Sequence, residues 1–444
     1  MRKCCLIIFS LCFLVPEIFS QSQNEDLNSL ISTINQQAPR VMDKVIAWRR
    51  QFHQHPELSM REFNTSKFIA EKLKAMGLEV QTGVAKTGVV ALLKGGKPGP
   101  VVALRADMDA LPIQERNALP FRSIDTTLYN GKMTNVSHAC GHDSHVAMLL
   151  GAAEILTSIK KDLKGTVKFI FQPSEEGPPA GEEGGAKLMV KEGVLENPKV
   201  DVIFGQHISS GDKIGIFSFK SGSVSAENDI FKIVVHGKQS HGAAPWRGVD
   251  PIVTASQMVM ALQTIISRNS PINNSAAVLT VATFHSGNRE NIIPEDAVLT
   301  GTIRTLDTSM RNTIHQRIRE VVAGIASSAG ATADVNISME DAMMVNDPVL
   351  TTEMSPVLKA IVGDSNNVIV PAGMGAEDFA YFSQRVPGFY YQVGALPPGK
   401  KAEDVSHHSP NFMIDESSFV YGVRALCYLT VNYMEKHAEV KSKN

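Results

Sequence analysis

The chain has 444 residues, with 43% hydrophobic and 20% charged side chains, a composition typical of globular proteins with enough apolar material for a core. Its formal net charge is −2 and its pI is near 6.7, so the sequence indicates neither a nucleic-acid partner nor a basic membrane-binding surface. The length favours two or three domains.

The N-terminus differs in character from the rest of the chain. Two basic residues precede the apolar run CCLIIFSLCFLVPEIFS, which is too short and too interrupted for a membrane-spanning helix. We predict a signal peptide over 1–20 and an exported protein, periplasmic or secreted, without a membrane anchor. Cleavage would leave only Cys140 and Cys427, too few for a disulfide framework.

Strand-like and helix-like segments alternate in the first half of the chain. The predicted elements are a helix within 65–80, a strand within 100–112, a helix within 145–159, and strands within 165–177 and 201–209. This alternation favours an α/β fold with a mainly parallel mixed sheet and helices on both faces.

The three predicted strands share a chemical feature. Each is apolar through its body and ends in acidic residues or a histidine. Open α/β sheets bind their ligands outside the carboxyl ends of the strands. We therefore expect one rim to collect Asp107, Asp109, Glu175, Glu176 and His207.

The pattern changes between 222 and 335. The predicted order is a strand within 229–239, a helix within 250–266, strands within 275–287 and 296–305, a helix within 310–330 and a strand within 332–340. This β-α-β-β-α-β order is ferredoxin-like. We predict a linker at 21–39, a catalytic domain in two parts (40–221 and 336–435), an inserted α+β domain at 222–335 and a tail at 436–444.

The stretch SHACGHDSHVAML, residues 137–149, holds three histidines, one cysteine and one aspartate. Only Gly141 separates Cys140 from His142, and in an extended loop positions i and i+2 point the same way. Together with the oxygen and nitrogen donors of the predicted rim, they suit zinc or another late first-row divalent ion better than magnesium or calcium. The competing interpretation is a histidine-rich loop without a task beside a solvated Glu175–Glu176 pair.

Nine motifs carry a resemblance to a known family. In chain order they are ALRADMDALPI, SHACGHDSHVAMLLGAAEIL, FQPSEEG, GQHI, HGAAPWRGVDPI, NIIP, GTIRT, GAEDFAYF and HHSPNFMIDE. The chain resembles the co-catalytic metallo-amidohydrolases that include hippurate hydrolase, N-acyl-amino-acid amidohydrolase, N-acetyldiaminopimelate deacetylase and the plant indole-acetate–amino-acid hydrolases. The resemblance covers about 40–435 and is specific for the family, not for the substrate.

The resemblance implies two divalent metal ions per chain, zinc or manganese, with cobalt or nickel also possible. By position, the implied ligands are Cys140, His142, Glu176, His207 and His408. Glu175 corresponds to the general base and Asp109 to the residue that orients a ligand histidine, whereas Asp107 is not expected to ligate. We choose His408 over His407 because HSP is the family's usual triplet. His53 and His55 are either solvated residues or partners of the ligands.

The resemblance also implies that the inserted domain is a lid through which the protein forms a homodimer. His241 corresponds to a lid histidine that reaches an active site, commonly that of the partner subunit; otherwise it only caps its loop. Trp246 stands where many relatives have histidine. Asn291 and Arg304 are candidates for binding the substrate carboxylate, although Arg304 can equally pair with a surface acid.

The implied activity is hydrolysis of an N-acyl amino acid or a short peptide-like substrate. The alternatives are a di- or carboxypeptidase of the same family, and a non-catalytic binding protein on this scaffold. Retention of every expected ligand and of Glu175 argues against the last of these.

Overall fold

The structure is a computed structural model that describes residues 15–438, with side-chain burial described from Glu25 onward. Most of the predicted signal peptide therefore lies outside the described residues. The described chain forms two compact units. The first contains the residues up to Ser218, Thr352–Val368 and the residues from Tyr390 onward, and the second contains Phe219–Thr351 and Ile369–Phe389. The sequence predicts one continuous inserted segment, whereas the second unit also takes in a later part of the chain.

The first helix, α1 (Val15–Gln54), runs through the segment 21–39 for which the sequence analysis expects a linker. The physical reason is a stripe of buried residues at helical spacing: Leu30, Ile34, Ala38, Val41 and Val45. Through this stripe α1 packs against α3 (His142–Ser158) and α9 (Phe419–His437). Within the described part of the chain, none of the helices has the length and apolarity that crossing a bilayer requires.

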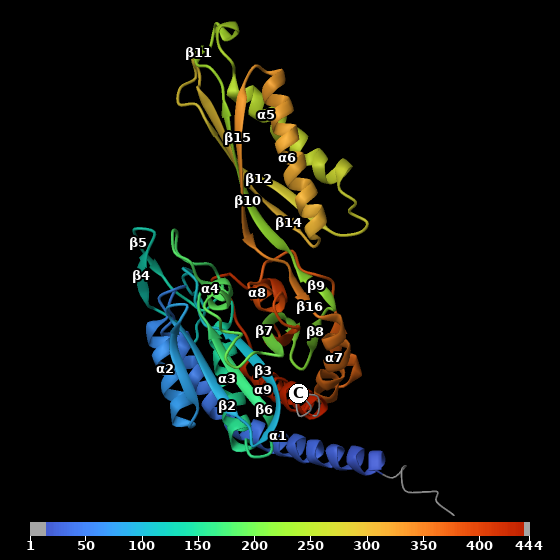
Figure 1. The fold of residues 1–444 in the computed structure, drawn as a ribbon. Helices are drawn as coiled ribbons and strands as arrows, with labels where there is room; N and C mark the ends of the chain where they lie inside the picture. The colour runs from blue at the N-terminus through green and yellow to red at the C-terminus, as the bar shows by residue number, and fades with distance from the viewer. Residues whose placement is uncertain (1–14, 439–444) are drawn as a thin grey trace, which may run out of the picture. The chain divides into compact units, whose positions relative to one another are not determined.

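An eight-stranded mixed sheet forms the centre of the first unit (Figure 1). Its order is β1 (Glu79–Val84), β2 (Gly88–Lys94), β6 (Lys164–Gln172), β3 (Lys97–Asp107), β7 (Val202–Lys213), β18 (Gly388–Leu396), β8 (Phe217–Phe219) and β17 (Asn367–Ile369). β3 runs parallel to β6 and β7, but β2 is antiparallel to both β1 and β6. The predicted α/β class is confirmed, with more antiparallel pairing than expected.

Helices cover this sheet. α3 and α9 pack against each other and against β3, and α2 (Phe63–Ala75) packs on β1 and β2. α3 is buried over nearly all of its length, because the sequence VAMLLGAAEIL is apolar on every side of the helix. The other described elements of the unit are β4 (Thr126–Tyr129), β5 (Lys132–Asn135), α4 (Gly185–Lys191) and most of α7 (Pro348–Val362).

The register of the central strands brings the ends of β3 and β6 close to His207 of β7. In the parallel pair of β3 and β6, Asp107 lies opposite Gln172, three residues before Glu175. In the parallel pair of β3 and β7, Arg105 lies opposite Gly205, two residues before His207. β3 and β6 therefore end at one edge of the sheet, whereas β7 runs on to Lys213 and presents His207 from its middle, so the prediction that this strand ends at the histidine is wrong. The candidate site lies at this edge.

The second unit is built on a four-stranded antiparallel sheet in the order β12-β14-β10-β15. Its elements are β10 (Glu227–His236), α5 (Pro251–Thr264), β12 (Ala277–Ser286), β14 (Asp296–Thr305), α6 (Thr308–Ser328) and β15 (Thr332–Asp341). Alternate residues of β10, Phe231, Ile233 and Val235, are buried in a core that includes residues of α5 and α6. Smaller elements are β9 (Gly222–Ser225), β16 (Met344–Asn346), α8 (Ala380–Ser383) and the ribbon of β11 (Ser240–His241) with β13 (Ile292–Ile293).

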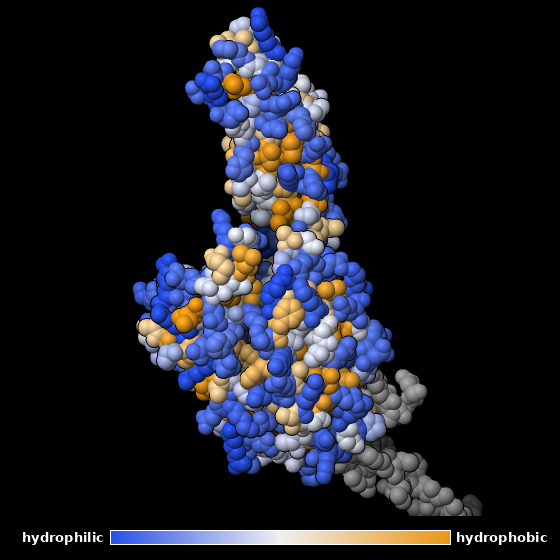
Figure 2. All heavy atoms as spheres, turned by 90° about the vertical axis from the view of Figure 1, so that its left-hand side faces the viewer, coloured by the Kyte–Doolittle hydropathy of each residue, from blue (hydrophilic) through white to orange (hydrophobic). Residues whose placement is uncertain are grey.

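The surface is mainly hydrophilic on the face shown in Figure 2, with apolar groups scattered among polar ones. This agrees with the mean hydropathy of −0.04 for the chain. Exposed apolar side chains include Leu128 on β4 and Met133 on β5.

Candidate metal centre

The turn into α3 places Cys140 and His142 beside each other, by a different backbone route from the one predicted. Gly141 has a φ of +93°, and His142 is already the first residue of the helix. The expectation of an extended loop is therefore wrong. The left-handed glycine turns the chain so that both neighbouring side chains serve one site, a conformation that a residue with a Cβ rarely adopts.

Cys140 lies between two histidines that are far apart in the sequence. Its Sγ is 3.4 Å from His207 Nε2 and 3.3 Å from His408 Nε2. His408 Nε2 is in turn 3.0 Å from Glu176 Oε1. The structure thus brings together two overlapping sets of donors, Cys140 with His142 and His207, and Cys140 with Glu176 and His408, in each of which the donor atoms lie within 4.8 Å of one another.

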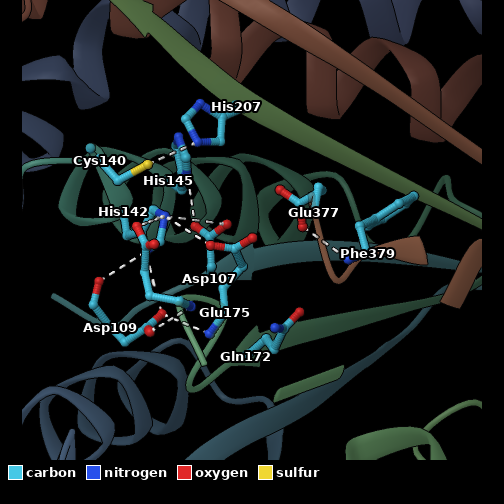
Figure 3. A network of polar contacts seen from close by, with 12 residues as sticks. Asp107, Asp109, Cys140, His142, His145, Gln172, Glu175, His207, Glu377 and Phe379 are labelled. Carbon is cyan, nitrogen blue, oxygen red and sulfur yellow. Dashed lines mark hydrogen bonds and ion pairs between the residues drawn. The ribbon is translucent and has the colours of Figure 1, made fainter. Parts of the chain in front are cut away.

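His142 faces Glu175, which follows β6 (Figure 3), and also lies close to Glu176. Its Nε2 is 3.7 Å from Glu175 Oε2 and 3.9 Å from Glu176 Oε1. Its Nδ1 is 2.8 Å from the backbone oxygen of Asp109, which can only accept, so Nδ1 carries the hydrogen and the Nε2 of a neutral ring is left with its lone pair. Within the described residues, this buried Nε2 makes no hydrogen bond. A lone pair held among carboxylates fits a metal cation.

The same reasoning gives the tautomer of His207, and the contacts of His407 and His408 show which histidine of the HHSP motif faces the site. His207 Nδ1 is 2.6 Å from the backbone oxygen of Ile208, so its Nε2 lone pair faces Cys140. His407 Nε2 accepts a hydrogen bond from the backbone N–H of Ser210 at 3.2 Å. The geometry therefore brings His408, and not His407, to the Cys140 thiol and the Glu176 carboxylate.

Hydrogen bonds and burial shift the pKa values at the centre in conflicting directions. Hydrogen bonds with Cys140 and Glu176 raise the pKa of His408 to about 10. Burial lowers the pKa of His207 well below its usual range, and neighbouring histidines add to this, whereas burial raises the pKa of the Cys140 thiol. A bound divalent cation would relieve the conflict, because metals bind the thiolate and the neutral imidazole.

Asp109 orients the site through its backbone and its carboxylate. Its Oδ1 is 3.3 Å from His142 Nδ1, beside the shorter contact of its backbone oxygen. The carboxylate also accepts the amide hydrogens of Glu175 and Glu176, each at 3.0 Å, and the hydroxyl of Ser59 at 2.7 Å. Burial opposes ionisation, but the contact with His142 keeps the pKa of Asp109 below its usual value.

Asp107 is held by two partners that the sequence analysis did not single out. Its Oδ2 accepts from Arg105 at 2.7 Å, and its Oδ1 is 2.5 Å from His145 Nδ1. His145 Nε2 accepts the backbone N–H of Ile208 at 2.8 Å, next to His207. Asp107, His142 and His145 also form a donor cluster of their own. One signal pointed to His145, because a residue three positions after His142 on a helix shares its face.

His53 is buried, whereas His55 lies at the surface. His53 Nδ1 is 2.8 Å from Asp143 Oδ2 and its Nε2 is 3.1 Å from Glu115 Oε1. Arg49 Nε is 2.7 Å from the same Asp143 oxygen. His53 is thus a partner of Asp143 in the first turn of α3, whereas His55 contacts Asp125 at 3.3 Å.

The remaining predicted residues belong to the second unit. His241 is exposed and its Nδ1 accepts the backbone N–H of Ala243 at 2.9 Å, which is the loop-capping contact. Asn291 lies beside it in the β11–β13 ribbon, where its backbone oxygen accepts from Gly242 at 2.9 Å. Arg304 pairs with Asn228 near the carboxyl end of β14. Since β14 is a strand of 10 residues that follows Asn291, one chain does not bring Asn291 and Arg304 together.

Known proteins are similar to this chain in sequence and in fold. Residues 103–432 match the pattern of peptidase family M20/M25/M40. Thermostable carboxypeptidase 1 of Saccharolobus solfataricus is 41% identical over 411 residues, which are 92% of this chain and 100% of that protein. N-acetyl-L-cysteine deacetylase of Bacillus subtilis is 38% identical over 403 residues, covering 90% and 91% of the two chains. The crystal structure of the YXEP protein of Bacillus subtilis, described as a dinuclear metal binding peptidase from the M20 family, superimposes with a TM-score of 0.74 at 33% identity, covering 89% and 99%.

These similarities define the class first: the chain is a metal-dependent hydrolase that acts on amides. It belongs to peptidase family M20/M25/M40, which confirms the resemblance to the metallo-amidohydrolases stated from its motifs.

Proposed function

We propose that the protein is an exported two-metal amidohydrolase that releases the acyl group from N-acyl amino acids. The observation that carries the proposal is the joint placement of one thiol, three imidazoles and two carboxylates beside the ends of β3 and β6 and the middle of β7. Cys140, His142, Glu176, His207 and His408 would hold the ions. Mixed sulfur, nitrogen and oxygen donors of this kind suit zinc and other late first-row ions; manganese, which prefers oxygen, is the family's other candidate.

The chemistry divides between the ions and the chain. Bound divalent ions would lower the pKa of a water and polarise the scissile carbonyl. Glu175, close to His142 and anchored through its amide on Asp109, takes the proton of the attacking water and delivers it to the leaving nitrogen. Asp109 keeps the His142 hydrogen on Nδ1, which leaves Nε2 available as a ligand.

The similar proteins support two substrate classes. The deacetylase of Bacillus subtilis acts, by its name, on an N-acetylated amino acid, which supports the acyl substrate. The relative from Saccharolobus solfataricus is named a carboxypeptidase, which makes a peptidase the second candidate. Both substrates are amides with a free carboxylate. They differ in the acyl part that carries the scissile carbonyl, which is a simple acyl group in one case and a peptide or amino acid in the other.

The second unit completes the proposal. We infer that the protein is a homodimer through this unit, and that His241 stabilises the oxyanion in the site of the partner subunit. Asn291 lies beside His241 in the ribbon and would act with it, whereas Arg304 would bind the substrate carboxylate from another position. The loop contact of His241 with Ala243 is compatible with this role, because it uses Nδ1 and leaves Nε2 for the substrate.

A substrate panel tests the activity. Purified protein is freed of metal, reloaded with zinc, manganese, cobalt or nickel, and assayed with N-acetyl amino acids, N-benzoyl amino acids and dipeptides. Saturation should give about two ions per chain, and Cys140→Ala should lose at least one. Cleavage of dipeptides alone would replace the acyl-amino-acid proposal with the peptidase, and no cleavage by the metal-replete protein would refute both.

The general base has its own test. Glu175→Gln should keep metal content and substrate binding but lower turnover about 10²–10⁴-fold, because the amide cannot accept a proton at neutral pH. Glu183→Gln is the matched control, since Glu183 lies in the same segment, is exposed and forms an ion pair with the exposed Lys191. An unchanged rate in metal-replete Glu175→Gln would remove Glu175 from the role.

The dimer and the export are tested separately. His241→Ala should lower turnover about 10²-fold without loss of metal. Mixing His241→Ala with Glu175→Gln should restore activity if His241 acts across the dimer, because one site then holds both intact residues. Expression of the full chain with N-terminal sequencing should find a mature protein that begins near Gln21; an unprocessed cytoplasmic product would contradict export.

A further inference from the structure

Two buried carboxyl groups hold three consecutive amides at the end of β6. The amide of Ser174 donates to Glu62 Oε1 at 2.9 Å, and the next two amides donate to Asp109 at 3.0 Å each. Ser174 has a φ of +57°, a backbone conformation that residues other than glycine rarely adopt. The turn that aims Glu175 and Glu176 is therefore held from outside its own segment.

Glu62 is held beside Ser174 by burial and by a second hydrogen bond. Its side chain is fully buried, and its second oxygen is 2.7 Å from the Thr87 hydroxyl. It comes directly before α2, on a part of the chain that the motifs of the candidate site do not include. Both oxygens meet neutral groups, an amide and a hydroxyl.

We propose that Glu62 is a positioning residue of the metal centre, whose carboxyl group holds the Ser174 amide and so fixes the direction in which Glu175 and Glu176 leave β6. This inference rests on the proposed function. Without the acceptor, the Ser174 amide would be buried without a partner, and the left-handed turn would lose the contact that stabilises it. A turn that relaxes at Ser174 would move both glutamates relative to His142.

The chemistry of Glu62 indicates that reach matters more than charge. Burial, together with the charge of Asp109, raises the pKa of Glu62 to about 8. The Thr87 hydroxyl donates to one carboxyl oxygen while the other oxygen accepts from Ser174. A glutamine at this position would offer the same acceptor to Ser174 and could donate its amide hydrogen to the Thr87 oxygen, whereas an aspartate would keep the acid but withdraw it by one methylene group.

The test compares Glu62→Gln with Glu62→Asp in the full-length protein. We expect Glu62→Gln to bind cobalt(II) within about threefold of the wild-type affinity, with the wild-type visible spectrum. Glu62→Asp should bind cobalt(II) about 10–100-fold more weakly, the usual effect of losing a group that orients a ligand, with an altered spectrum and a lower kcat at similar KM. The matched control is Glu57→Asp, because Glu57 accepts the amides of Asn64 and Thr65 at the start of α2 and does not hold the turn. It should lower stability alone.

Each outcome decides the proposal. Wild-type cobalt affinity and spectrum in Glu62→Asp would overturn it, as would an equal loss in Glu62→Gln, or a loss in Glu57→Asp as large as that in Glu62→Asp. The cobalt measurements need no substrate. If the wild-type protein binds cobalt but cleaves nothing in the panel, the proposed function fails while the comparison of these variants still decides the role of Glu62.

Discussion

Replacing Gly141 by alanine should both destabilise the fold and weaken metal binding, because the added Cβ meets a side chain next to a proposed ligand as well as straining the backbone. The φ of +93° at this glycine costs an alanine about 1–2 kcal/mol. The new Cβ would also lie 2.3 Å from Ile208 Cγ2 and 3.2 Å from Phe412 Cζ, an overlap worth about 1–3 kcal/mol in a packed core. The total destabilisation should reach about 2–5 kcal/mol. Because Ile208 follows His207 directly, relief of the overlap displaces a proposed ligand.

The assay compares Gly141→Ala with Gly193→Ala by urea denaturation of the metal-free proteins and by cobalt(II) titration. Gly193 has a φ of +81°, and an added Cβ would meet nothing within 4 Å, so this control carries the backbone strain without the overlap. We expect Gly193→Ala to cost about 1–2 kcal/mol and to bind cobalt normally. Equal destabilisation by the two substitutions, or wild-type cobalt affinity in Gly141→Ala, would refute the reasoning.

Three further results are expected. Removal of metal by a chelator should lower the Tm, since an ion at 1,000 times its Kd stabilises the folded state by about 4 kcal/mol, and an unchanged Tm would count against a filled site. Asp229, whose pKa is lowered by its contacts with Arg311 and His315 despite burial, contributes stability that is present above its unfolded pKa and lost as pH falls through its folded pKa. Asp229→Asn should therefore cost about 3 kcal/mol at pH 7 in thermal melts, and this cost should shrink only as the pH falls below about 4 toward the lowered folded pKa. Asp107→Leu should cost about 3–5 kcal/mol by removing a carboxylate that pairs with the buried Arg105, and adding Arg105→Met should recover part of that loss, whereas additive losses in urea denaturation would contradict it.

The fold class followed from the sequence because its strongest signals are local. Alternating apolar runs and amphipathic segments predicted the strands β3, β6 and β7 and the helix α3. The antiparallel pairing of β1 and β2 was missed, since the hairpin turn between them depends on Ala85 and Lys86 at positive φ, and neither residue type signals such a turn. The linker expected at 21–39 was missed for a different reason: the apolar stripe of α1 is spaced widely among polar residues and is stabilised by packing on α3 and α9.

The candidate ligands could be named from the sequence because the motifs that contain them resemble a known family, whereas residue types and spacing alone favoured a metal without giving the full set of ligands. What the sequence could not supply was the order of contacts among them. Cys140 contacts both His207 and His408, which lie 67 and 268 residues after it in the chain. The backbone oxygen of Asp109, which sets the tautomer of His142, carries no residue-specific signal at all.

The residues that position the ligands are harder to predict from the sequence than the ligands themselves. A ligand can be predicted from its residue type. A positioning residue can be predicted only where burying its polar or charged group would cost free energy unless a partner is present. Arg105 is a charged residue inside the apolar strand VVALRAD, and a buried cation there requires a buried anion, which Asp107 supplies. That inference was open to a reader of the sequence once β3 was placed at the centre of the sheet. Glu62 gave no such signal, because the stretch SMREFN around it mixes polar and apolar residues. The hydrogen bond from the Ser174 amide shows that its buried carboxyl group lies beside the candidate metal centre.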